Sequence, residues 1–126
     1  MTLQVVSGID LVEIARFREL KPEIWDRFAR RVFTEEERAY IGNSFERAAG
    51  IFSAKESIAK ALGCGIGIIT WQDMSISHGE AGNPQVELRK GAADLALQQG
   101  ITSWSISISH TQTIACAVAV AIKQTP

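Results

Sequence analysis

The C-terminal run of residues 114–122, IACAVAVAI, constrains the fold most, because it is apolar almost throughout. A strand of this composition offers apolar side chains on both faces, and one layer of helices over a small sheet covers only one of them. An exposed edge strand of this kind would aggregate. We therefore expect the strand to be central in a sheet or buried in a subunit contact, and we expect the protein to form a cyclic homo-oligomer.

The size and composition of the chain indicate a single domain over residues 1–126, with 46% hydrophobic and 21% charged residues. No apolar run reaches the about 18 residues that span a bilayer, and the N-terminus lacks the pattern of a signal peptide, so we expect a cytoplasmic protein without membrane contact. The net charge of -1 argues against general nucleic-acid binding. Cys64 and Cys116 have no second Cys or His at ligand spacing, so neither a zinc site nor a disulfide framework is indicated, and we expect both to be reduced packing residues.

The N-terminal half predicts one strand followed by short helices. Residues 3–14 read LQVVSGIDLVEI, a β-rich run in which Gly8 indicates a bulge or a close approach of the backbone. Apolar residues at spacings of three and four then predict two short helices that are broken near Pro22. Thr34 and Glu37 form a capping-box pattern at the start of a further helix.

The C-terminal half predicts mainly strands. We expect a hairpin over 71–89, a helix over 91–100, and a strand over 104–110 that alternates apolar residues with serines. His78 falls in the hairpin turn and is assigned no role. With the C-terminal run, these elements predict an α+β fold in which an antiparallel sheet of about five strands packs against a long helix and shorter helices.

The long helix is predicted within residues 45–67, FERAAGIFSAKESIAKALGCGIG, with Asn43 or Ser44 as its cap. On a helical wheel its apolar residues gather on one side, and Glu56 falls in the middle of that stripe. A carboxylate in such a place needs a partner or a metal ion. The alternative is an i,i+4 pair of Glu56 with Lys60, worth about 0.2–0.5 kcal/mol on an exposed face.

Asp10 and Glu56 are the candidate metal ligands. Two carboxylates, together with waters and a substrate phosphate, make a typical Mg²⁺ site. Alternatively, Asp10 only caps a helix that begins near Val12. His110, at a strand end, is either a base or phosphate donor or a structural residue.

A basic segment follows the first strand. Although the whole chain is nearly neutral, this segment can form a local basic face that suits an acidic partner. Its members are Arg16, Arg18, Lys21, Arg27, Arg30 and Arg31.

Several of these residues together resemble the successive signatures of the 4′-phosphopantetheinyl transferases. In length and order the chain is similar to the short, single-domain bacterial type, holo-[acyl-carrier-protein] synthase. The resemblance covers nearly the whole chain and is strongest where a GxD pattern and a KExxxKA pattern occur at this separation. It is carried by Gly8-Ile9-Asp10 with Glu13 and Arg16, Phe52 to Glu56 with Lys60-Ala61, Gly63, Gly65 and Gly67, and Ser107 to His110.

The resemblance implies an activity. Such enzymes move the 4′-phosphopantetheine arm of coenzyme A onto a serine of an apo acyl carrier protein and release adenosine 3′,5′-bisphosphate, with Mg²⁺ on the pyrophosphate. By similarity, Asp10 and Glu56 bind Mg²⁺, and Lys60 stabilises the transferring phosphate or helps to remove the serine proton. The short type is a homotrimer with active sites between subunits.

The resemblance also implies binding residues. Those for coenzyme A are Lys55, Lys60, Gly63, Gly65, Ser109 and His110, and those for the acidic carrier are Arg16, Arg27 and Arg31. Two positions depart from the pattern. Ile51 stands where this type usually has an arginine associated with the coenzyme A phosphates, and Thr111 follows His110 where some members have an acidic residue.

Two other classes of function remain open. A different Mg²⁺-dependent phosphoryl or nucleotidyl transferase would need its own phosphate loop, and no GxxxxGK[ST] pattern is present. A non-catalytic carrier-binding subunit would use the arginines but could lose Glu56 without consequence. The residues do not identify the carrier, whether from fatty-acid, polyketide or another pathway.

Overall fold

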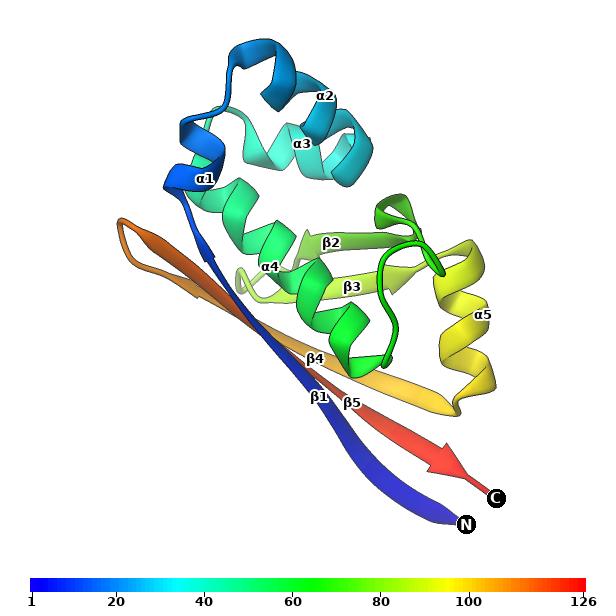
Figure 1. The fold of residues 1–126 in the computed structure, drawn as a ribbon. Coiled ribbons are helices and arrows are strands. Elements are labelled where there is room, and N and C mark those ends of the chain that lie inside the picture. The colour runs from blue at the N-terminus through cyan, green and yellow to red at the C-terminus, as the bar shows by residue number, and fades with distance from the viewer.

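The computed structural model describes residues 1–126 and shows the predicted α+β fold, in which helices cover one face of a sheet (Figure 1). None of the helices has the length and hydrophobicity needed to span a bilayer. The elements in chain order are β1 (Thr2–Glu13), α1 (Ala15–Arg18), α2 (Pro22–Val32), α3 (Glu35–Ile41), α4 (Phe45–Ala61), the 3₁₀ turn η1 (Trp71–Asp73), β2 (Met74–His78), β3 (Pro84–Leu88), α5 (Lys90–Gln98), β4 (Ile101–His110) and β5 (Ile114–Thr125).

The five strands are all antiparallel but form two sheets. One sheet has the order β1-β5-β4, and β2 pairs only with β3. The single five-stranded sheet that we predicted is therefore wrong in this detail. A groove lined by residues 83–86 and 102–107 separates β3 from β4, so their backbones do not pair.

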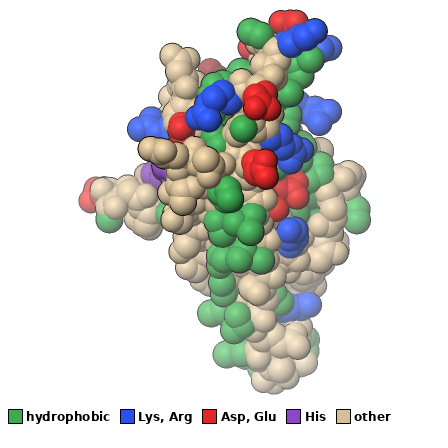
Figure 2. Space-filling view, turned by 60° about the vertical axis from the view of Figure 1, so that its left-hand side comes forward, with side chains coloured by type: hydrophobic (Ala, Val, Ile, Leu, Met, Phe, Trp, Pro, Cys, Tyr) green, Lys and Arg blue, Asp and Glu red, His purple; other side chains and the backbone are tan.

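Strand β5 is central, as predicted, and its two faces differ. Ala115, Ala117, Ala119 and Ala121 are buried on the face that α4 covers. The opposite face is open and apolar, and Figure 2 shows hydrophobic side chains in a band that runs down toward the ends of β1 and β5. The residues of this open face are Leu3, Val5, Ile9 and Leu11 of β1, all exposed, with Cys116, Val118, Val120 and Ile122 of β5.

Gly8 marks a close approach and not a bulge. The pairing of β1 with β5 is continuous from Thr2 to Glu13. A Cβ atom at Gly8 would lie 2.0 Å from the Ser57 carbonyl oxygen, because α4 crosses β1 at this point. Asp10 lies inside the strand, opposite Ala117, so the alternative in which it caps a helix is wrong.

Three helices begin where local sequence signals place them. Pro22 occupies the first turn of α2. The Thr34 hydroxyl accepts a hydrogen bond from the Glu37 N–H at 3.2 Å, and the Glu37 carboxylate accepts one from the Thr34 N–H at 2.8 Å. Ser44 caps α4 by accepting a hydrogen bond from the Arg47 N–H at 3.1 Å.

Helix α4 is buried nearly all round, which corrects the single apolar stripe that we predicted. Between Ala48 and Ala59 only Glu56 is not buried. The helix lies between the three-stranded sheet on one side and α1, α3 and β2 on the other, so no wide face is left for solvent (Figure 1). Glu56 therefore stands at the one opening along this stretch of the helix.

Candidate functional site

Asp10, Glu56 and Lys60 come together where α4 crosses β1. The Lys60 ammonium donates to the Ile9 carbonyl oxygen at 2.9 Å and lies 3.3 Å from Asp10 Oδ1. Lys60 thus pairs with Asp10, and the predicted alternative of an i,i+4 pair with Glu56 is not formed. The Lys60 side chain is 54% exposed and the Asp10 side chain 14%, so the pair faces solvent at its lysine end.

Glu56 makes no hydrogen bond or ion pair with the protein. Burial raises the pKa of its carboxyl group above the ordinary value, and the neighbouring Asp10 charge raises it further, while Lys60 and Arg16 act in the opposite direction. The Asp10 charge disfavours ionisation of Glu56, and a cation between the two carboxylates would relieve this repulsion.

The donor set suits Mg²⁺. No group of three or more His, Cys, Asp or Glu side chains is present, so Asp10 and Glu56 would be the only protein side chains of these types to hold a cation. Mg²⁺ commonly uses one or two carboxylates and fills its other positions with water and phosphate oxygens. The residues therefore fit the predicted ion and leave room for a phosphorylated substrate.

Helix α4 fixes the part of β1 that carries Asp10. The Ser53 hydroxyl donates to the Asp10 carbonyl oxygen at 2.8 Å, and Lys60 holds the preceding carbonyl group. The contact at Gly8 brings the two backbones together one residue further back. Asp10 is placed mainly by these backbone contacts, and the one side chain that contacts its carboxylate is Lys60.

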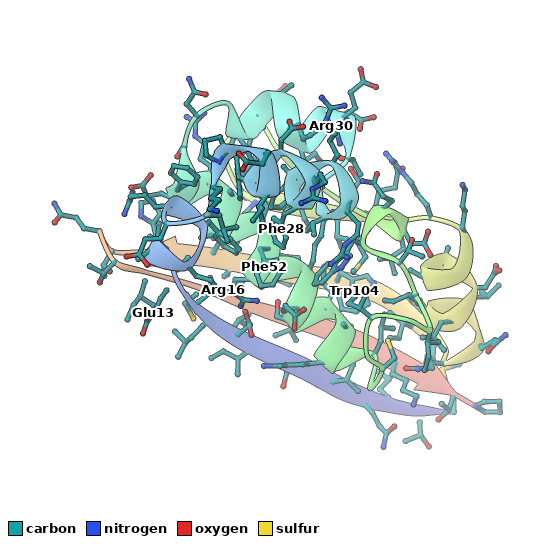
Figure 3. All side chains as sticks on the ribbon, turned by 45° about the horizontal axis from the view of Figure 1, so that its top comes forward. Glu13, Arg16, Phe28, Arg30, Phe52 and Trp104 are labelled. Atoms are coloured by element: carbon teal, nitrogen blue, oxygen red, sulfur yellow. The ribbon has the colours of Figure 1, made fainter.

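The arginines of the basic segment are exposed, and Arg16 lies beside this site. The Arg16 guanidinium lies 5.4 Å from the centre of the Phe52 ring (Figure 3). Arg27 and Arg31 line a shallow groove with Ile24 and Phe28. A second groove of about 810 Å³ is lined by Arg30, Arg31 and Arg38 with residues 66–72.

His110 lies in a small pocket of about 140 Å³ between the N-terminal half of α4 and the end of β4. Sequence reasoning missed three side chains here, Tyr40, Arg47 and His78. The Arg47 guanidinium lies 4.8 Å from the centre of the Tyr40 ring, and that ring stacks on His78 at 4.2 Å. Burial, followed by the Arg47 charge, lowers the pKa of His78.

The sequence held a hint of the role of Arg47. Ile51, which stands where the family usually has an arginine, lines this same pocket, and Arg47 precedes it by four residues, one turn of helix. Gly50 in the pocket and Glu56 are six residues apart, which is about 9 Å along the helix axis.

The other residues predicted to bind coenzyme A are not gathered in this pocket. Ser109 lies next to His110 on a strand, so their side chains point to opposite faces of the sheet. Gly63 and Gly65 are exposed in the loop beyond the other end of α4, where Gly63 has a φ of 71°.

Lys55 lies inside the protein. Its side chain is 0% exposed, and its ammonium group contacts Glu37 at 2.6 Å, the Val32 carbonyl oxygen at 2.7 Å and the Trp71 carbonyl oxygen at 3.1 Å. An ammonium group has three donors, and all three are used here. This geometry does not support the predicted contact of Lys55 with coenzyme A.

Comparison with known proteins identifies relatives over nearly the whole chain. The sequence model described as "4'-phosphopantetheinyl transferase superfamily" matches residues 7–119. A holo-[acyl-carrier-protein] synthase of Caldanaerobacter subterraneus is 40% identical over 123 residues, which cover 95% of this chain and 96% of the relative.

Solved structures of relatives share the fold. The Helicobacter pylori holo-[acyl-carrier-protein] synthase in complex with coenzyme A has a TM-score of 0.83 and 33% identity, covering 91% of this chain and 98% of that one. The Bacillus anthracis holo-(acyl-carrier-protein) synthase, in complex with "CoA (3',5'-ADP)", has a TM-score of 0.78 and 28% identity, covering 98% and 100%.

Proposed function

The chain belongs to the 4′-phosphopantetheinyl transferase superfamily and, within it, to the holo-[acyl-carrier-protein] synthase type, and on this premise we propose its reaction. It transfers the 4′-phosphopantetheine arm of coenzyme A to a serine of an apo acyl carrier protein and releases adenosine 3′,5′-bisphosphate. The observation that carries this proposal is the cluster of Asp10, Glu56 and Lys60 at the opening beside α4.

Asp10 and Glu56 would hold Mg²⁺, which neutralises charge that develops on the pyrophosphate during attack by the serine oxygen. Lys60 has a largely exposed ammonium group with a donor left after its bonds to Ile9 and Asp10. This donor can reach the transferring phosphate, where a positioned cation stabilises the transition state.

The nucleotide end of coenzyme A is proposed to bind at the pocket of His110. Arg47 supplies the guanidinium group that Ile51 lacks, since both residues line this pocket one helical turn apart. Gly50 and Glu56 lie about 9 Å apart along the axis of α4 and on different sides of it, so a ligand that joins the pocket to the metal carboxylates would have to pass around the helix.

The acidic carrier is proposed to dock on Arg16, Arg27 and Arg31. All three are exposed, and none has an acidic partner within the chain. Arg16 lies over Phe52 of α4, four residues before Glu56, so a carrier seated on these arginines brings its serine toward the metal carboxylates.

The open apolar face of β1 and β5 supports the proposal of a homotrimer. Four exposed apolar residues of β1 lie beside the half-buried valines of β5, and a monomer would leave them in water. Ser109 points to this face, so a neighbouring subunit can bring the dispersed coenzyme A residues together. We expect V118R to give a dissociated and inactive protein, with light scattering reporting the oligomeric state.

Mass spectrometry of candidate apo carriers tests the proposed reaction. After incubation with the protein, coenzyme A and Mg²⁺, we expect the mass of one phosphopantetheine arm on the carrier, and no addition when a chelator is present. The first substrates to test are the cytoplasmic acyl carrier proteins of fatty-acid and polyketide synthesis. A carrier that binds the protein but stays unmodified under all conditions would instead indicate a non-catalytic carrier-binding subunit.

A further inference from the structure

A buried polar network surrounds the lysine that precedes the metal carboxylate Glu56 in the chain. Lys55 and Glu37 are both 0% exposed, and their charged groups lie 2.6 Å apart. The Glu37 carboxylate also accepts hydrogen bonds from the backbone N–H groups of Thr34 at 2.8 Å and Ile76 at 2.6 Å. No buried side-chain nitrogen or oxygen in the protein is left without a partner.

The network joins five segments at one point. Lys55 belongs to α4 and donates to the end of α2 at Val32 and to η1 at Trp71. Glu37 belongs to α3 and holds the first turn of that helix and strand β2. Rotation or sliding of α4 would break several of these bonds together. The network therefore holds the side of α4 that faces α2, α3, η1 and β2.

The side of α4 that faces β1 is held by contacts with that strand. Ser53 and Lys60 hold the carbonyl groups of Asp10 and Ile9, and Gly8 lies against the Ser57 backbone. Glu56 moves with the helix and Asp10 with the strand. The distance between their carboxylates therefore depends on the helix being held from both sides.

We infer that Lys55 and Glu37 are positioning residues, which set the separation of the Asp10 and Glu56 carboxylates and thereby the affinity for the metal ion. This inference rests on the proposed function. It assigns Lys55 a role other than contact with coenzyme A, because its ammonium group is enclosed and saturated.

The test uses the double variant K55M/E37L, which removes both charges and keeps the core apolar. Removal of one partner alone would leave an uncompensated buried charge, whereas apolar replacement of both is often tolerated. We measure Mn²⁺ binding in the presence of coenzyme A by electron paramagnetic resonance, and the KM for coenzyme A and kcat in carrier modification. We expect Mn²⁺ affinity to fall about tenfold while the KM for coenzyme A stays within about twofold of wild type.

A matched control lowers stability without touching α4. A92G/A96G alters two buried positions of α5, and we expect it to lose thermal stability but keep wild-type Mn²⁺ affinity. If K55M/E37L does not fold, the single variant E37D, which keeps both charges but shortens the carboxylate side chain by one methylene group, serves in its place with a smaller loss of the same sign.

Two results would overturn the inference. A folded double variant with unchanged Mn²⁺ affinity would show that the pair only stabilises the fold. A raised KM for coenzyme A at unchanged Mn²⁺ affinity would return Lys55 to the coenzyme A site. Mn²⁺ binding is measured without a carrier, so it decides the inference separately from whether the proposed transfer reaction occurs.

Discussion

Lys55 and Lys60 lie five residues apart on α4 and both pair with a carboxylate, yet the two pairs differ in nearly every property. Lys55 and Glu37 are 0% exposed and 2.6 Å apart, whereas Lys60 and Asp10 are 54% and 14% exposed and 3.3 Å apart. Burial lowers the pKa of Lys55, and Glu37 opposes that shift. The first lysine has no donor to spare, and the second has one. The two lysines of the KExxxK pattern therefore separate into one that holds the helix and one that can meet a substrate.

The largest expected effect comes from removing the carboxylate of Asp10 or of Glu56. We expect D10A or E56A to reduce transfer by roughly 10³-fold or more while the fold is kept, because the charge of the bound metal ion is worth several kcal/mol in the transition state. Steady-state kinetics measure the transfer rate, and circular dichroism shows whether the fold is kept. Near-normal turnover of either variant in Mg²⁺ would contradict the assignment.

Removal of Lys55 alone is expected to act on stability. K55M leaves the Glu37 charge buried without a cation, and breaking one side of a buried pair costs about 3–5 kcal/mol. Urea unfolding measures the change in the free energy of unfolding. A loss below about 1 kcal/mol, the range of exposed pairs, would show that the two lysine pairs are energetically alike.

Removal of Lys60 is expected to show the opposite pattern. K60M loses an exposed ion pair, so its unfolding free energy should change by less than about 1 kcal/mol. Transfer should fall about 10²- to 10³-fold, the usual cost of one transition-state donor. K123M, which alters a half-buried lysine of β5 outside the site, is the control and should match wild type in both measurements.

The raised pKa of Glu56 predicts a pH dependence of stability. Because the folded state binds this proton more tightly than the unfolded state, the contribution is present below the ordinary pKa of about 4.5 and is lost as the pH rises to the raised value. E56Q lacks this loss and should be the more stable protein at neutral pH without metal. Thermal unfolding of both proteins with a chelator, from about pH 4 to about pH 8, compares the curves. Parallel curves would argue against a raised pKa.

The smallest effect concerns Arg47, a third cation of α4. We expect R47A to raise the KM for coenzyme A about tenfold with kcat nearly unchanged, because one charge-assisted hydrogen bond is worth about 1.5–3 kcal/mol. The matched control is R30A, which lies outside the His110 pocket. An equal change in both variants would show that general positive charge, and not this pocket, attracts the nucleotide.

Local signals predicted where three of the helices begin. Pro22, the capping box of Thr34 and Glu37 and the cap at Ser44 each depend on neighbours within a few residues, and the structure confirms them. The separation of β3 from β4 depends on packing between distant segments, which no local pattern encodes.

In the candidate site, too, local motifs predicted some residues, whereas contacts between distant segments were missed. The GxD and KExxxKA patterns indicated Asp10, Glu56 and Lys60, and the structure brings these three together, although metal binding itself stays a prediction. The helical wheel misplaced the burial of α4, because a helix enclosed on several sides has no single apolar stripe. The partner of Lys55 is Glu37, eighteen residues earlier, and only the folded chain brings the two into contact.

The strand order β1-β5-β4 makes the last strand the only ladder partner of both others. During synthesis on the ribosome, β1 emerges before β5 and cannot pair until residues 114–125 have been made. Such long-range pairing slows folding, and the nascent chain carries the apolar residues of β1 unpaired in the meantime. The strand that carries Asp10 thus gains its ladder partner only when residues 114–125 have followed it.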